Sequence, residues 1–191
     1  MKILVVIGHQ SPGSYCHAIA RTAIEELQAR GHEVVFHDLY QERFDPVLPA
    51  EEVPKDQTPA PEVARHCDEL MAADGLVIVH PNWWGQPPAM LKGWVDRVLR
   101  QGVAYEFGEG GAVVGHLVGK TAVVLTTSNT PREAELSQFG DPLQNLWERC
   151  ILGFCGVRDF ERRNFESIIL STFEERTAWL QEVREIIRRR F

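Results

Sequence analysis

Hydrophobic residues follow two alternating patterns along this chain. Residues 2–8, 75–80 and 120–127 are continuous apolar runs, as is typical of strands buried on both faces of a parallel sheet. A run at 33–39 and a weaker one at 160–168 predict two more strands. Apolar residues at helical spacing predict helices over 19–30, 63–71, 87–99 and 141–152, and in the segment that a Thr172–Glu175 capping box opens.

The alternation of strands and helices predicts the fold class. We expect an α/β fold, a flavodoxin-like doubly wound five-stranded parallel sheet of order 2-1-3-4-5, with helices on both faces. Residues 1–191 are expected to form a single domain, because their number suits one domain and the alternation continues past the proline-rich segment. Two segments are expected to be long loops: residues 41–61, with five prolines, and residues 102–119, with six glycines. Gly93 lies inside a predicted helix and predicts close packing there.

Composition narrows the class of protein. The 191 residues include 20 basic and 27 acidic side chains, a net charge of −7, whereas a nucleic-acid-binding protein would need a basic face. No apolar run reaches the roughly 20 residues that span a bilayer, and residues 2–8 are too short for a secretory signal, so we expect a cytoplasmic protein. The four cysteines lack a Cys-x-x-Cys pair and are expected to be reduced thiols. The seven histidines form no recognisable ligand set, so no metal site is predicted.

The predicted topology locates a ligand crevice. In a doubly wound sheet the crevice lies at the carboxyl ends of the strands where the winding direction reverses, here the first and third strands. The loops that follow Gly8, His80 and Thr127 border this crevice.

The first crevice loop, residues 9–16, favours phosphate binding. It leads into a helix start, whose free N–H groups and positive dipole end attract anions, and Ser11 and Ser14 add hydroxyl donors. The alternative is that one of these serines only caps the helix. The loop matches neither a P-loop nor the Gly-x-Gly-x-x-Gly pattern of dinucleotide-binding domains.

The other two crevice loops favour a flat ring. Trp83 and Trp84 stand before a double proline in a strand-to-helix turn that normally carries small polar residues. Rigid aromatic walls suit a heteroaromatic ring, and the alternative is a packed corner in which one tryptophan covers the sheet edge. The third loop, residues 126–130, offers hydroxyls and backbone N–H groups that would stabilise negative charge on a reduced flavin.

At this point the chain resembles a known family, the NAD(P)H:quinone oxidoreductases of the DT-diaphorase type and their short bacterial relatives, which include the ancillary oxidoreductases of glutathione-gated potassium efflux systems. The resemblance covers about residues 2 to 170, and its most specific part is the block from Trp84 to Trp94. The matching residues, in order, are His9 with Ser14; Asp38-Leu-Tyr40 and Phe44-Asp-Pro46; Pro81-x-x-Trp84-x-x-x-Pro88-Ala-x-Leu-Lys-Gly-Trp94; Ala104-Tyr105; and Lys120 through Thr126-Thr127.

The resemblance implies a tightly bound flavin and a homodimer with its flavin sites at the subunit interface. It implies cofactor binding by three groups of residues: His9, Ser14, Tyr15 and Cys16 along the phosphate and ribityl chain; Pro81, Asn82, Trp83, Trp84 and Gly85 beside the isoalloxazine; and Thr126, Thr127, Ser128 and Asn129 at its pyrimidine side. Tyr105 and Phe107 match aromatic residues that reach over the flavin of the other subunit, and together with Trp84 and Phe139 they are expected to wall the substrate pocket.

The activity that the resemblance implies is a flavin-dependent NAD(P)H oxidoreductase that reduces quinones or similar flat electrophiles by ping-pong two-electron hydride transfer. FMN is the first choice of cofactor, FAD is the alternative, and NAD(P)H is the electron donor. The chain departs from the family pattern at Phe139, which stands where the family's catalytic histidine precedes a Gly-Asp pair, so no catalytic residue is assigned.

Two other functions remain open from the sequence. One is a regulatory ancillary subunit of a potassium efflux system, which would have a membrane transporter as its partner. The other is a flavodoxin-like electron carrier that transfers single electrons.

Overall fold

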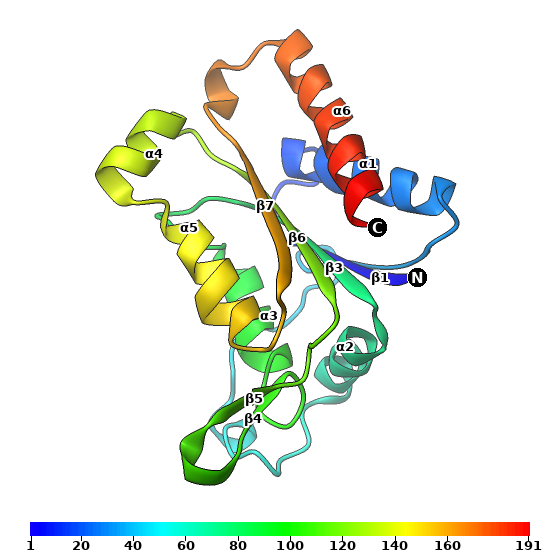
Figure 1. The fold of residues 1–191 in the computed structure, drawn as a ribbon, viewed down its shortest axis with the longest axis vertical. Helices are drawn as coiled ribbons and strands as arrows, with labels where there is room; N and C mark the ends of the chain where they lie inside the picture. The colour runs from blue at the N-terminus through cyan, green and yellow to red at the C-terminus, as the bar shows by residue number, and fades with distance from the viewer.

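The computed structural model describes all residues, 1–191, and contains the predicted parallel sheet. The sheet has five strands in the order β2-β1-β3-β6-β7, which confirms the predicted order, since β6 and β7 are the fourth and fifth of its strands along the chain (Figure 1). The strands are β1 (Lys2–Ile7), β2 (Glu33–Asp38), β3 (Gly75–Pro81), β6 (Thr121–Thr127) and β7 (Asp159–Phe165). All neighbouring pairs are parallel, so the carboxyl ends of the strands lie along one edge.

Helices cover both faces of the sheet. On one face lie α1 (Tyr15–Ala29) and α6 (Phe173–Arg190), side by side in Figure 1. On the other face lie α2 (Pro61–Ala72), α3 (Ala89–Val98) and α5 (Pro142–Asn145), the last continuing as a π-helix over Leu146–Gly153. None of these helices combines the length and the apolar character needed to cross a bilayer.

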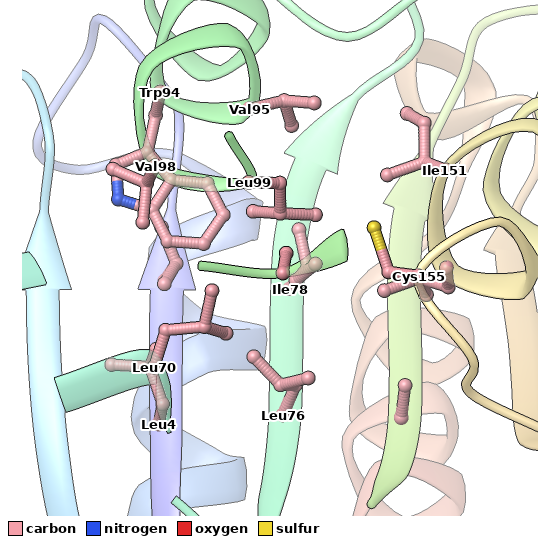
Figure 2. Close-up of a cluster of buried hydrophobic side chains, with 14 of the residues drawn as sticks. Leu4, Leu70, Leu76, Ile78, Trp94, Val95, Val98, Leu99, Ile151 and Cys155 are labelled. Atoms are coloured by element: carbon pink, nitrogen blue, oxygen red, sulfur yellow. The ribbon is translucent and has the colours of Figure 1, made fainter. Parts of the chain in front are cut away.

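Side chains of the inner strands feed two separate cores. In β1, Leu4 and Val6 belong to a cluster of 25 buried residues beneath α2, α3 and α5, part of which Figure 2 shows around Trp94. Ile3, Val5 and Ile7 belong to a cluster of 16 buried residues beneath α1 and α6. Because successive residues of a strand face opposite sides, burial on both faces requires the continuous apolar run seen in the sequence.

The glycine-rich segment 102–119 is not wholly a loop, and the prediction there was wrong. It contains an antiparallel hairpin of β4 (Tyr105–Phe107) and β5 (Val113–Gly115), joined by a short 3-10 turn at Glu109–Gly111. Strands of three residues are too short to leave an alternating pattern in the sequence. The hairpin lies against the end of the π-helix, where a Cβ on Gly115 would overlap the Cys155 backbone.

A short helix, α4 (Arg132–Phe139), also escaped prediction, because it is amphipathic only weakly and leaves most of its side chains exposed. Further 3-10 turns lie at Ala50–Glu52 and Ile168–Leu170.

The proline-rich segment, residues 41–61, is held by α3. Arg97 donates to Glu52 Oε1 at 2.7 Å and to the Asp45 carbonyl at 2.8 Å. A Cβ on Gly93 would overlap the Pro46 carbonyl oxygen, which confirms the predicted close packing at this glycine.

Candidate functional site

The three predicted crevice loops meet at the carboxyl edge of the sheet. Cys16 Sγ, in the first turn of α1, lies 3.3 Å from Thr127 Oγ1 at the end of β6. The backbone N–H of Asn82 donates to the Thr127 carbonyl at 2.7 Å, so the loop after β3 runs beside the loop after β6. The helix start and the tryptophan loop therefore belong to one region of the molecule.

The tryptophan loop is a tight turn that presents Trp84 to solvent. Trp83 and Gln86 exchange two backbone hydrogen bonds of 2.9 Å, and the two residues between them have positive φ, 55° at Trp84 and 72° at Gly85. Two positive φ angles define a type I′ turn, which suits glycine but is strained for a bulky side chain. The side chain of Asn82 closes the turn by accepting from the Gly85 N–H at 2.8 Å. Trp84 is 98% exposed as a result.

A cavity of about 440 Å³ lies beside this turn. Trp83, Trp84 and Phe139 give it aromatic walls, and its remaining lining residues are Asn82, Gly85, Ser128, Asn129, Thr130, Glu135 and Pro142. The volume is that of a pocket for a small organic ligand. Glu135 is buried and accepts a hydrogen bond from Asn82 Nδ2 at 3.2 Å, so α4 is tied to the tryptophan turn.

The start of α1 has the donor chemistry of an anion site. Ser14 is the N-cap residue, and the first turn of the helix contains no acidic side chain. His9 Nδ1 accepts the Ser11 N–H at 3.0 Å, which leaves the other ring nitrogen as the N–H of a neutral imidazole. Burial and the neighbouring His17 lower the pKa of His9, which favours that neutral form. Serine capping and phosphate binding are therefore compatible here, because capping uses the acceptor capacity of Ser14.

His17 links the helix start to the end of β2. Ser14 Oγ lies 2.8 Å from His17 Nδ1, and His17 Nε2 lies 2.9 Å from Asp38 Oδ2. The other carboxylate oxygen of Asp38 accepts the backbone N–H groups of Tyr40 and Gln41, at 3.2 and 3.1 Å. The three side chains form one hydrogen-bonded line beneath the first crevice loop.

Several residues predicted for the cofactor site direct their side chains into the protein. Cys16 is buried, and burial raises the pKa of its thiol to about 12, so the thiol stays protonated. Thr126 Oγ1 donates to Asn164 Oδ1 at 2.9 Å. Tyr15 donates through its hydroxyl to the Arg176 carbonyl at 2.6 Å and packs edge-on against Phe165. What these residues offer a ligand is mainly backbone, at the two loop starts.

Pro81 ends β3 over a buried histidine–tryptophan pair. His80 is fully buried, its Nδ1–H donates to the Pro81 carbonyl at 2.8 Å, and its Nε2 accepts the Trp147 indole N–H at 2.9 Å. Burial lowers the pKa of His80 to about 4, so the ring is neutral. Neither ring lines the cavity beside the tryptophan turn.

Tyr105 and Phe107 do not line the cavity beside the tryptophan turn. They form an aromatic cluster with Phe154, with ring centroids 4.9 Å apart for Tyr105–Phe154 and 6.4 Å apart for Phe107–Phe154. Tyr105 instead borders a second cavity of about 500 Å³, between α3, the proline-rich segment and the π-helix. Within one chain, these two predicted pocket residues are thus separated from Trp84 and Phe139.

Sequence reasoning missed Glu135 as a lining residue and His17 as a partner of Ser14. A signal existed for the first, since Pro131 followed by acidic residues and a later Gly140 is the usual pattern of a short helix. The contact of His17 with Asp38 needed the sheet order, because Ile7 pairs with Asp38 and so places that carboxylate beside the start of α1.

One histidine cluster has ligand atoms at metal-site spacing, His37, Glu42 and His66. Its hydrogen bonds describe an ion-pair network instead. The ring nitrogens of His37 lie 2.9 Å from Glu42 Oε1 and 2.7 Å from Glu69 Oε2. Trp94 donates its indole N–H to His66 Nδ1 at 3.1 Å, so in the neutral ring Nε2 carries the proton, and it lies 3.6 Å from Glu42 Oε2, beyond hydrogen-bond distance.

Comparison with known proteins agrees with this architecture. The family model for the flavodoxin-like fold matches residues 1–189. An uncharacterized NAD(P)H oxidoreductase of Haemophilus influenzae is 32% identical over 95% of this chain and 91% of its own length. NAD(P)H dehydrogenase (quinone) 1 of Rattus norvegicus is 31% identical over 87% of this chain and 69% of its own. The crystal structure of Smu.1420 from Streptococcus mutans has a TM-score of 0.89 and 34% identity, over 99% of this chain and 100% of that one. The chain therefore belongs to the flavodoxin-like NAD(P)H:quinone oxidoreductase family, and it is an oxidoreductase enzyme.

Proposed function

We propose that this protein is a flavin-dependent NAD(P)H oxidoreductase that reduces quinones or similar flat electrophiles by a ping-pong reaction. The observation that carries the proposal is the pairing of an aromatic-walled cavity with an anion-binding helix start on the same edge of the sheet. A flavin mononucleotide has the matching halves, a flat ring and a phosphate tail. FMN is accordingly the proposed cofactor, with FAD as the alternative.

When bound, the flavin supplies the redox chemistry, accepting a hydride from NAD(P)H and passing two electrons to the acceptor. The protein supplies binding and orientation. Trp84 offers an indole face in water that a ring can cover, and the type I′ turn holds that indole in place. The backbone N–H groups of Asn129 and Thr130 are the proposed donors toward the pyrimidine edge of the ring, since the Ser128 N–H already donates to the Phe165 carbonyl at 3.0 Å.

The start of α1 would hold the phosphate. Ser14, His9 and the free N–H groups of the first helical turn are the proposed donors, and the absence of an acidic residue in that turn removes repulsion. The space next to Gly13, just before the start of α1, is open, since a Cβ on Gly13 would meet no atom within 4 Å.

The proposed active form is a homodimer. Phe107 is 52% exposed, and its cluster with Tyr105 and Phe154 is separate from the cavity of its own chain. We propose that this cluster faces the cavity of the second subunit and completes the pocket for NAD(P)H and the acceptor. The donor preference between NADH and NADPH belongs to this completed pocket.

Absorbance and activity test the proposal. We expect the purified full-length protein to be yellow, to release FMN on heating, as identified by mass analysis, and to oxidise NADH or NADPH with menadione in steady state. Trp84→Ala should reduce both turnover and flavin retention, while Trp84→Phe should keep most of both. Phe36→Ala, at an exposed aromatic on the outer strand β2, is the matched control and should match the wild type.

The outcomes separate the candidate functions. Colourless protein that binds no added flavin would remove the proposal. Flavin binding with no NAD(P)H oxidation, and a one-electron-reduced flavin that persists in anaerobic titration, would indicate an electron carrier instead.

A further inference from the structure

Ser14, His17 and Asp38 are joined by hydrogen bonds, and the number of protons on the His17 ring determines what Ser14 can offer a phosphate. Asp38 Oδ1 accepts two backbone N–H groups, and Asp38 Oδ2 faces His17 Nε2 at 2.9 Å. A carboxylate only accepts, so His17 Nε2 carries a proton. The open question is the proton on His17 Nδ1, which lies 2.8 Å from Ser14 Oγ.

The two states of His17 give Ser14 opposite roles. With a neutral imidazole, Nδ1 is an acceptor and takes the only hydroxyl hydrogen of Ser14, so Ser14 would present lone pairs to an incoming phosphate. With an imidazolium, Nδ1–H donates to Ser14 Oγ, and the hydroxyl hydrogen is free to point at the phosphate. The charged ring also places a positive charge one side chain away from the anion.

We propose that binding of the flavin phosphate at the start of α1 is coupled to protonation of His17, which frees the Ser14 hydroxyl to donate to the phosphate. This inference rests on the proposed function. His17 is a positioning residue in this scheme, because it acts on the ligand through Ser14. The ring is turned opposite to that of serine hydrolases, in which Nε2 faces the serine.

The surroundings of His17 favour this assignment over the neighbouring histidine. Asp38 at the end of β2 and His9 after β1 are the titratable groups placed against it. His9 has its Nδ1 engaged as an acceptor of the Ser11 N–H, with ring centroids 6.0 Å from His17, and has no carboxylate hydrogen-bonded to it. His17, by contrast, has Asp38 Oδ2 at 2.9 Å from its Nε2 and Ser14 Oγ at 2.8 Å from its Nδ1.

The test compares flavin dissociation across pH. Full-length protein loaded with FMN or with riboflavin is diluted at pH values from 6.5 to 8.5, and free flavin is read by fluorescence. We expect the Kd for FMN to rise by about tenfold across this range, because the proposed coupling takes up one proton and protons become scarcer as pH rises. The Kd for riboflavin, which lacks the phosphate, should change by less than about twofold. The phosphate of FMN titrates near pH 6 and would give the opposite trend, since deprotonation strengthens it as an anion.

Histidine variants test whether the pH dependence of FMN binding comes from His17. His17→Gln should weaken FMN at pH 6.5 and abolish the pH trend, and His9→Gln should keep the trend. His32→Gln, at a histidine in the turn between α1 and β2 at the amino edge of the sheet, should behave as the wild type. The same series is run with FAD, and a rise of Kd with pH for FMN supports the coupling whatever FAD shows.

The coupling and the proposed function fail in different ways. A wild-type Kd for FMN that is constant or falls with rising pH overturns the coupling, as does a trend that survives in His17→Gln or is equal for riboflavin. In those cases flavin binding itself still stands. Failure of all three flavins to bind at any pH overturns the proposed function.

Discussion

Four of the five tryptophans occupy two opposite environments. Trp94 and Trp147 are fully buried on the same side of the sheet, and each donates its indole N–H to a buried histidine, His66 and His80. Trp83 and Trp84 are 48% and 98% exposed at the carboxyl edge. The same side chain is therefore structural in one region and exposed in the other.

The two regions differ in the surroundings of the indole, which decide whether its N–H needs a protein partner. A buried indole N–H needs an acceptor, and a neutral histidine supplies one without leaving a charge in the core. An exposed indole keeps its apolar area in water, and at Trp84 the backbone is also strained. Exposure of that kind is typical of a surface built for a ligand.

Among these tryptophans, removal of Trp94 should cause the largest loss of stability. Trp94→Ala is expected to lower the free energy of unfolding by about 3–5 kcal/mol, since it leaves a cavity under α3 and takes away the donor to His66. Urea denaturation followed by circular dichroism measures this loss. Trp94→Phe, which keeps a ring, should lose less, and equal losses in the two variants would contradict the role assigned to packing.

Trp147→Phe isolates the hydrogen bond in the second buried pair. It leaves His80 Nε2 without a donor, and we expect a loss of about 1–3 kcal/mol in the free energy of unfolding. Thermal and urea unfolding against the wild type provide the measurement. An unchanged midpoint would mean that the His80 ring finds another partner.

The buried region should also show a pH dependence that the exposed one lacks. Burial opposes the charge on His37, but Glu42 and Glu69, which accept hydrogen bonds from its two ring nitrogens, raise its pKa above the ordinary histidine value. A raised pKa stabilises the fold at pH values below about 6.5, the pKa of an unfolded histidine, and this contribution is lost as pH rises through the folded value.

Urea denaturation of the wild type and of His37→Gln between pH 6 and 9 measures this contribution of His37. The stability advantage of the wild type should be greatest at the acidic end and shrink toward the alkaline end. We expect it to be smaller than the effect of either tryptophan truncation. An advantage that grows with pH would show that His37 is neutral in the fold.

Substitution of Trp84 should have the smallest effect on stability. Trp84→Ala is expected to unfold within about 0.5 kcal/mol of the wild type, because the side chain is in water. Trp84→Gly should be more stable than Trp84→Ala by about 0.5–1 kcal/mol, since glycine adopts positive φ without strain. Urea midpoints give both values, and a large loss in Trp84→Ala would mean that this indole packs against the fold.

The elements predicted well are those with a long, regular signal. The runs ending at Gly8 and His80 are β1 and β3, and the capping box at Thr172 opens α6 with both of its hydrogen bonds present. The hairpin around Tyr105 and the helix α4 are too short or too weakly amphipathic to leave such a signal. Of the candidate site, the sequence indicated the tryptophan turn and the Ser14 helix start, but it did not indicate Glu135 or His17.

The sequence by itself determined the layered architecture and the edge of the sheet at which to look for a site. Hydrophobic periodicity is a short-range pattern that every strand and helix carries, and the alternation of strands with helices favours a doubly wound sheet with its crevice at the carboxyl ends of the strands. Only the tertiary structure decided which tryptophan is core and which is surface, and that Asp38 stands behind His17. Those outcomes depend on contacts between residues far apart in the chain, such as Trp94 with His66 and Ile7 with Asp38, which come together only when the strands pair.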